Sequence, residues 1–148
     1  MRIIGIDCWD VIFRSWLTTP LPNAFSSLRK LVLSNHFNEV FIVSKVSFIG
    51  KYIVLFNFWR LNFYNYTGIS KKNVYFCRHN RDKAIICEEL GITDFIDDRL
   101  EVLNYMGSVD HLYALNPRKE EFKKYPDITK KITIVKSWNE IISLLLSD

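Results

Sequence analysis

The sequence lacks the features of disulfide-rich, zinc-binding and membrane-spanning proteins. Its three cysteines, Cys8, Cys77 and Cys87, lie in apolar runs without CxxC spacing, which argues against disulfides and zinc and favours the reducing cytoplasm. No apolar run approaches the roughly 20 residues of a membrane helix, so we expect no membrane partner. The N-terminal MRIIGID has too short an apolar part to be a signal peptide.

Linkers, low-complexity tracts and internal repeats are also missing. We therefore predict one domain over residues 1–148, with a single hydrophobic core. Aromatic residues make up 15% of the chain, a high share. The net charge of +4 would suit a polyanion such as a nucleic acid, although scattered surface lysines give the same total.

Short runs rich in Ile, Val and Phe alternate along the chain with helix-like segments. We expect strands at 3–6, 39–43, 73–77, 94–96, 111–115 and 132–135, and helices at 23–34, 51–66, 83–90, 99–106 and 138–146. Asp82 is expected to cap the helix at 83–90, and Gly91 to end it. The alternation predicts an α/β fold, a doubly wound, mainly parallel sheet in three layers, which binds ligands at the carboxyl ends of its strands.

Polar residues stand where these strands end or where a helix begins: Asp7, Ser44, Lys83, Asp97 and Asp98. Each alone is more often a turn or capping residue. Their order and spacing together are stronger evidence for a site, and we expect Asp7 to meet the paired acids in space.

In this order the residues resemble the four motifs of the haloacid dehalogenase (HAD) superfamily, mostly magnesium-dependent phosphatases with a Rossmann-like sheet. IIGIDCWDVI is similar to the first motif, D-x-D-x-[TV], and places Asp7 at the nucleophile. FIVS ends in Ser44, RDKAIICEELGI places Lys83 at a helix start, and FIDDR supplies the paired acids. FIDDR is also similar to the 3′-phosphatase domains of polynucleotide kinases.

The resemblance implies a phosphohydrolase that forms an aspartyl-phosphate on Asp7. Ser44 would donate a hydrogen bond to the phosphate, and Lys83 would offset charge and hold the nucleophile. Mg²⁺ is the implied cofactor, and its implied ligands are Asp7, the backbone carbonyl of Trp9, Asp97 and Asp98.

Trp9 departs from the family pattern, which has an aspartate there as general acid and base. Loss of a general acid typically costs about 10²- to 10⁴-fold in rate. Asp10 or a relayed water could replace it, or the protein could be a binding or scaffold module that keeps the metal site. In a third interpretation, Trp9 corresponds to the aromatic residue that the dehalogenases of the superfamily carry at this place. The two residues that follow it argue against this, because Asp10 and Val11 stand where the dehalogenases have Gly-Thr.

Short connections leave no room for a cap domain over the site. An open site could admit a phosphorylated polymer end, so a nucleotide or nucleic-acid 3′-phosphate is a candidate substrate. Arg99 and His79 are candidates for binding it, although a helix-capping arginine and a surface histidine are common.

The segment 52–66 contains many of the aromatic residues. Spacing by three and four predicts that one stripe faces the sheet, comprising Ile53, Leu55, Phe56, Trp59 and Phe63. The other rings, with Arg60, exceed what one buried stripe needs. They favour a homodimer contact, with a base-stacking platform as the second interpretation.

Overall fold

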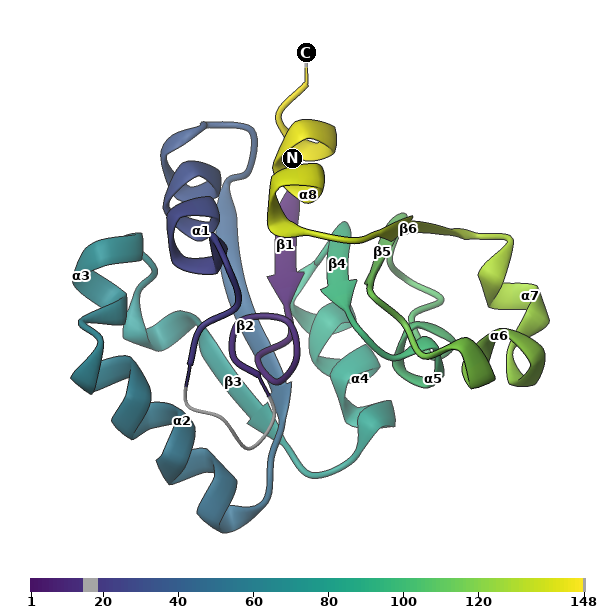
Figure 1. Cartoon of the computed structure of the whole chain (residues 1–148), viewed down its shortest axis with the longest axis horizontal. Helices are drawn as coiled ribbons and strands as arrows, with labels where there is room; N and C mark the ends of the chain where they lie inside the picture. The colour runs from purple at the N-terminus through teal and green to yellow at the C-terminus, as the bar shows by residue number, and fades with distance from the viewer. Residues whose placement is uncertain (15–18, 148) are drawn as a thin grey trace.

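The computed structural model describes residues 1–14 and 19–147, and its centre is one parallel sheet (Figure 1). The strand order is β3-β2-β1-β4-β5-β6, which confirms the predicted α/β class. The strands are β1 (Ile3–Ile6), β2 (Glu39–Lys45), β3 (Val74–Cys77), β4 (Asp94–Asp97), β5 (His111–Leu115) and β6 (Ile132–Val135).

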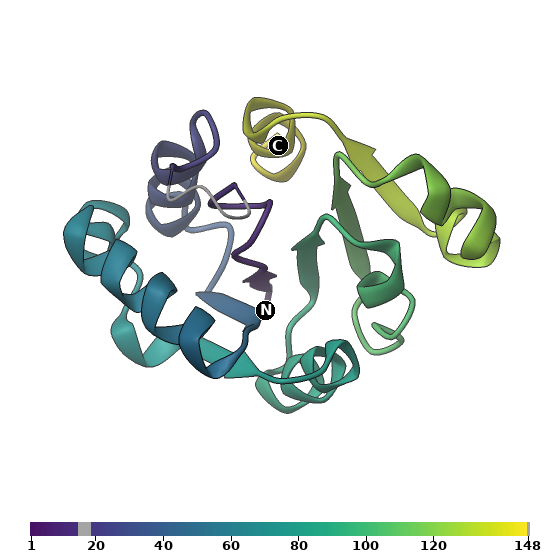
Figure 2. The same ribbon diagram turned by 60° about the horizontal axis from the view of Figure 1, so that its bottom comes forward.

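Helices cover both faces of the sheet, as Figure 2 shows. One apolar core lies beneath α1 (Ala24–Leu33), α2 (Phe48–Arg60), α3 (Phe63–Thr67) and α8 (Trp138–Leu145). The opposite core lies beneath α4 (Asn80–Leu90), α5 (Leu100–Leu103), α6 (Lys119–Lys124) and α7 (Pro126–Thr129). A 3₁₀ turn, η1 (Lys71–Asn73), precedes β3.

The centre of the sheet is tightly packed around β1. A Cβ added at Gly5 would lie 2.7 Å from the ring of Phe95 on the neighbouring strand β4, so only glycine fits there. At the other end of the chain, Trp138 is buried and donates a 2.7 Å hydrogen bond from Nε1 to the carbonyl of Val11. The start of α8 therefore fixes the loop that follows β1.

Two helix predictions need correction at their ends. Helix α4 begins at Asn80, and its N-cap is His79, so the prediction that Asp82 caps it is wrong. Asp82 lies in the first turn, where a carboxylate still favours the helix dipole. Gly91 does end the helix, with φ of 67°. Helix α5 ends at Leu103, because hydrogen bonds to the third residue back tighten the following turn.

The single helix predicted at 51–66 is two helices, α2 and α3. Asn62 separates them with φ of 55°, a left-handed conformation that ends helices. The predicted inward stripe is wrong at three positions, since Ile53, Phe56 and Trp59 are exposed. Both sides of α2 are apolar, so periodicity could not decide which side faces the sheet; the buried residues are Val54, Asn57 and Phe58.

None of the described helices is long and apolar enough to cross a membrane. Among the described residues, no inserted domain covers the carboxyl ends of the strands. In the part of the chain that the structure describes, that edge of the sheet is therefore open.

Candidate functional site

Three carboxylates meet at the point where strand order reverses. Strands β1 and β4 pair in parallel with Ile6 opposite Ile96, and the Asp7 amide donates a 3.0 Å hydrogen bond to the Ile96 carbonyl. Asp7 and Asp97 thus come next to each other at the same edge. One ligand oxygen each from Asp7, Asp97 and Asp98 lies within 4.8 Å of the others, and all three residues are buried. Such reversal points are where open parallel sheets bind ligands.

Lys83 projects into this cluster from the first turn of α4. Its Nζ lies 2.9 Å from Asp7 Oδ1 and 2.8 Å from Asp97 Oδ2. Burial lowers the pKa of Lys83, but the two carboxylates more than offset this and raise its pKa above the usual value. Lys83 is therefore a permanent cation within the cluster.

One lysine does not balance three carboxylates. Burial, followed by the charge of Asp97, raises the pKa of Asp7 to about 6, against the opposing effect of Lys83. Burial and the neighbouring carboxylates also raise the pKa of Asp98 to about 9. The cluster therefore lacks positive charge at neutral pH. Closely spaced hard oxygen ligands with excess negative charge fit a divalent cation.

A cavity of about 170 Å³ opens over the carboxylates. Its wall includes cations and an amide that sequence analysis did not identify: Lys45, Arg118 and Asn80. Lys45 is the last residue of β2, and Arg118 precedes α6, so the rule that ligands gather at strand ends could have identified both. The cavity can therefore attract an anion toward the carboxylates.

Solved structures resemble this fold, whereas no family model and no curated protein match the sequence. The D,D-heptose 1,7-bisphosphate phosphatase of Burkholderia thailandensis is 16% identical, with a TM-score of 0.63 and 100% of each chain covered. The cobalt-bound deoxy-D-mannose-octulosonate 8-phosphate phosphatase of Haemophilus influenzae is 13% identical, with a TM-score of 0.59, 99% of this chain and 87% of that chain covered. A protein described as a haloacid dehalogenase-like hydrolase, from Burkholderia xenovorans, has a TM-score of 0.62, is 15% identical, and is matched over 94% of this chain and 64% of that chain.

The fold is HAD-like. At these identities the likeness concerns the fold alone, and a designed Rossmann protein matches with a TM-score of 0.55. The chemistry of the site therefore depends on its own residues.

Ser44 lies in β2 at the same edge of the HAD-like sheet. It is fully buried and does not line the cavity. Its Oγ has no hydrogen-bond partner among the described residues. Buried hydroxyls normally have a partner. The Ser44 hydroxyl can therefore donate a hydrogen bond to a ligand that reaches it.

Arg99 lines the cavity, but its guanidinium is already paired. Nε donates to Glu121 Oε1 at 3.0 Å, and an Nη donates to Glu101 Oε2 at 3.2 Å. Its backbone amide donates to Asp97 Oδ1 at 3.0 Å and so orients that carboxylate. His79 is exposed and does not line the cavity. Of Arg99 and His79, the two residues predicted at the rim of the site, only Arg99 lines the cavity.

Trp9 and Asp10 both line the cavity. The Trp9 ring packs beside Phe13, with ring centroids 6.4 Å apart. Asp10 has φ of 61°, a left-handed conformation that turns the loop sharply. Its charge contributes to the raised pKa of Asp98. This turn of the loop brings Asp10 to the cavity that also contains the carboxylate cluster, which spacing along an extended chain would not predict.

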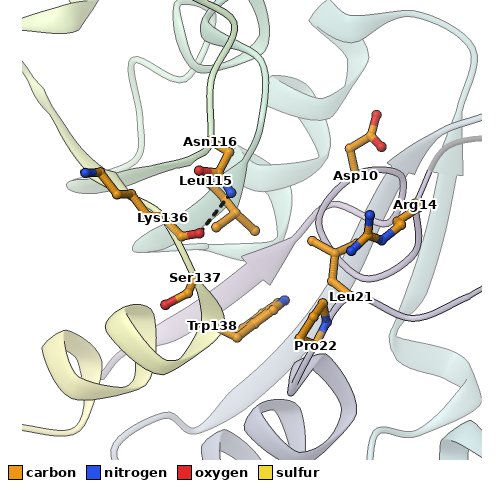
Figure 3. Close-up of a pocket in the computed structure, with 9 residues that line it drawn as sticks. All are labelled: Asp10, Arg14, Leu21, Pro22, Leu115, Asn116, Lys136, Ser137 and Trp138. Atoms are coloured by element: carbon orange, nitrogen blue, oxygen red, sulfur yellow. Dashed lines mark hydrogen bonds between the residues drawn. The ribbon is translucent and has the colours of Figure 1, made fainter.

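A second cavity, of about 360 Å³, adjoins the first and shares Asp10 with it (Figure 3). One wall is apolar and comprises Leu21, Pro22, Leu115 and Trp138. Arg14 lines the same cavity, whereas the ammonium of Lys136 points away from Arg14 (Figure 3). Its volume falls in the range of small-molecule sites, about 300–1,000 Å³.

Proposed function

We propose that this protein is a Mg²⁺-dependent phosphohydrolase that forms an aspartyl-phosphate on Asp7. One observation carries the proposal: three buried carboxylates within 4.8 Å of one another at the switch point of a HAD-like sheet. Lys83, at 2.9 Å, holds the Asp7 carboxylate in place. In three-carboxylate clusters of this kind a bound cation offsets the repulsion between phosphate and protein.

Each residue then has a defined task. Asp7 attacks the phosphorus with one carboxylate oxygen, and the ester oxygen leaves with the alcohol. Asp7, Asp97, Asp98 and the Trp9 carbonyl would hold the ion, which would supply electrostatic stabilisation of the phosphate oxygens. Ser44 is the proposed donor to the phosphate, because its buried Oγ lacks a partner in the described part of the chain.

A proton must still reach the leaving alcohol, and Trp9 cannot supply it. The acidic residues that line the cavity are Asp7, Asp10, Asp97 and Asp98. If three of these hold the ion, Asp10 is the remaining carboxyl group there. We therefore assign proton transfer to Asp10, which makes the enzyme slower than one with an acid directly at residue 9.

The substrate we propose is an exposed phosphate, such as a nucleotide or nucleic-acid 3′-phosphate. Support comes from the open edge of the sheet and from Lys45 and Arg118 on the wall of the first cavity. The adjoining cavity offers an apolar wall and Arg14, and would take the organic part of the ester. A polyanion that contacts Lys45 and Arg118 would bind less tightly as salt is added.

Hydrolysis of p-nitrophenyl phosphate with Mg²⁺ tests the proposal. We expect phosphate release by the wild type, none by Asp7→Asn, and wild-type rates for the exposed Asp127→Asn on α7. Equal rates for the wild type and Asp7→Asn would refute it. Because Trp9 occupies the place of the usual acid, the competing function is that of a HAD-like scaffold. For a scaffold, calorimetry would show Mg²⁺ binding, and neither this ester nor a 3′-phosphorylated oligonucleotide would be hydrolysed.

Two further parts of the proposal concern location and assembly. We assign the protein to the cytoplasm, because its cysteines are free thiols, two of them buried. We also propose that the chain forms a homodimer through the predicted segment 52–66. This segment belongs to α2 and α3, which lie at the outer edge of the molecule in both views (Figures 1 and 2).

A further inference from the structure

Helix α2 presents a continuous apolar surface to solvent. We call it the outer face of α2, and it consists of Phe48 (62% exposed), Ile49 (71%), Tyr52 (57%), Ile53 (41%), Phe56 (56%) and Trp59 (75%). The opposite side of the helix is also apolar and packs on the sheet through Val54 and Phe58. A surface helix normally shows charged residues on its outward side. This helix has its apolar residues on both sides, so the fold alone does not explain the outer face.

We propose that the outer face of α2 is the interface of a two-fold symmetric homodimer, in which the α2 helices of two copies pack antiparallel. This inference is independent of the proposed reaction. A monomeric but active protein would overturn the dimer alone, and an inactive dimer would overturn the phosphatase alone.

The size of the outer face supports a second copy of the chain. With large side chains of about 150–250 Å² each, these exposed fractions correspond to roughly 700 Å² of surface. The largest apolar patch on a typical monomer covers about 300–600 Å². Two such faces would together bury roughly 1,400 Å², and specific stable interfaces bury about 1,200–2,000 Å². The outer face is thus large for a monomer and adequate for a dimer.

Its composition is also that of an interface centre, where Phe, Tyr, Trp and Arg are enriched and acidic residues are depleted. The sequence has no Asp or Glu from residue 40 to residue 81. The two cations of α2 are engaged within the chain: Lys51 Nζ lies 5.8 Å from the ring centroid of Phe76, and Arg60 donates to Asn57 Oδ1 at 3.0 Å. A helix that lies on an anionic membrane needs free cations along its polar side. A protein surface is the better match.

The order of residues along α2 is suited to antiparallel self-association. A two-fold axis that crosses α2 between Ile53 and Val54 sets Trp59 against the partner subunit's Phe48, and Phe56 against the partner subunit's Tyr52. An isologous interface needs such self-complementarity, because every contact occurs twice. Antiparallel packing also brings the positive N-terminus of each helix beside the negative C-terminus of the other.

Light scattering coupled to gel filtration measures the mass directly. We expect the full chain at 20 µM to elute with twice the 17.6 kDa of one chain. Phe56→Glu places like charges near the axis and should raise the dissociation constant about 100-fold or more, giving a monomer. Ile85→Glu on α4 is the matched control, since Ile85 is 54% exposed and Phe56 is 56% exposed; this control should remain dimeric. Circular dichroism checks that both variants are folded.

Cross-linking tests the orientation. In a background without native cysteines, a mixture of Phe48→Cys and Trp59→Cys chains should form a disulfide, whereas neither variant alone should. Cross-linking of Phe48→Cys to itself would overturn the antiparallel arrangement. A monomeric wild type at 100 µM would overturn the dimer, as would a dimeric Phe56→Glu. Binding of a monomer to phosphatidylserine vesicles, lost in Phe56→Glu, would assign the outer face to a membrane surface instead.

Discussion

Lys83 and Asp7 form an ion pair inside the molecule, with Nζ and Oδ1 2.9 Å apart and side chains only 3% and 8% exposed. The same ammonium lies 2.8 Å from Asp97. Buried charges are costly unless they are paired, and loss of one partner leaves the other uncompensated. Lys83 therefore holds the folded site together as well as orienting the nucleophile.

Replacement of Lys83 by Met should destabilise the protein, because it leaves adjacent carboxylates without a cation. We expect the free energy of unfolding at pH 8 to fall by about 3 kcal/mol or more. The loss should be smaller at pH 5, where the carboxyl groups can take up protons. Urea unfolding at both pH values measures this. The exposed Lys72→Met is the control and should unfold like the wild type; a loss that is equal at pH 5 and pH 8 would contradict the explanation.

Stability without added metal should fall as the pH rises from about 4 to about 9. The folded protein keeps protons on Asp7 and Asp98, whose pKa values are raised to about 6 and about 9 from 3.8. The unfolded chain has released these protons by pH 5, so each increase in pH favours unfolding. Thermal unfolding across this range measures the effect. In Asp98→Asn the decline above pH 6 should disappear.

Mg²⁺ should oppose this decline, since ligand binding to the folded state alone raises its stability. Protons compete with the ion for the same carboxylate oxygens. We therefore expect 10 mM Mg²⁺ to raise the unfolding temperature more at pH 8.5 than at pH 5. An equal shift at both pH values, or the same shift in Asp97→Asn, would place the ion elsewhere.

Lys45 and Arg118 should govern the affinity for a nucleic-acid end. We expect Lys45→Ala and Arg118→Ala each to raise the KM for a 3′-phosphorylated oligonucleotide and to reduce the salt dependence of kcat/KM by about 0.7 per lost contact. Rates at several salt concentrations measure this. Lys72→Ala should change neither quantity. No effect of either substitution would leave the proposed substrate without support from these residues.

The sheet could be predicted from the sequence because buried parallel strands are continuous apolar runs bounded by helix signals. Asp7 and Asp97 could be brought together on the same basis, since parallel strands end at one edge. The side of α2 that packs on the sheet could not be predicted, because apolar residues occur on both sides of this helix. The buried side even includes a polar residue, Asn57, whose Nδ2 donates a hydrogen bond to the Ile53 carbonyl.

The sequence alone also could not predict that Asp10 lines the cavity. A residue three positions after Asp7 lines the cavity, and its backbone is left-handed, a conformation that is uncommon for residues other than glycine. Aspartate is among the residues that adopt it most readily. An Asn-Gly or Asp-Gly pair would have signalled such a bend; DCWDVIF carries no such signal.

Asp10 and Trp9 can be separated by two substitutions in the proposed phosphatase. Asp10→Asn keeps the size of the side chain but removes the ionisable carboxyl group, so kcat for an ester with a poor leaving group should fall about 10²- to 10⁴-fold. The loss should be small for p-nitrophenyl phosphate and large for an alkyl phosphate, because nitrophenolate leaves without a proton. Trp9→Asp should raise kcat for the alkyl ester and rescue Asp10→Asn in the double variant. If Asp10→Asn slows both esters equally, Asp10 shapes the loop and transfers no proton, and the rescue by Trp9→Asp should then fail.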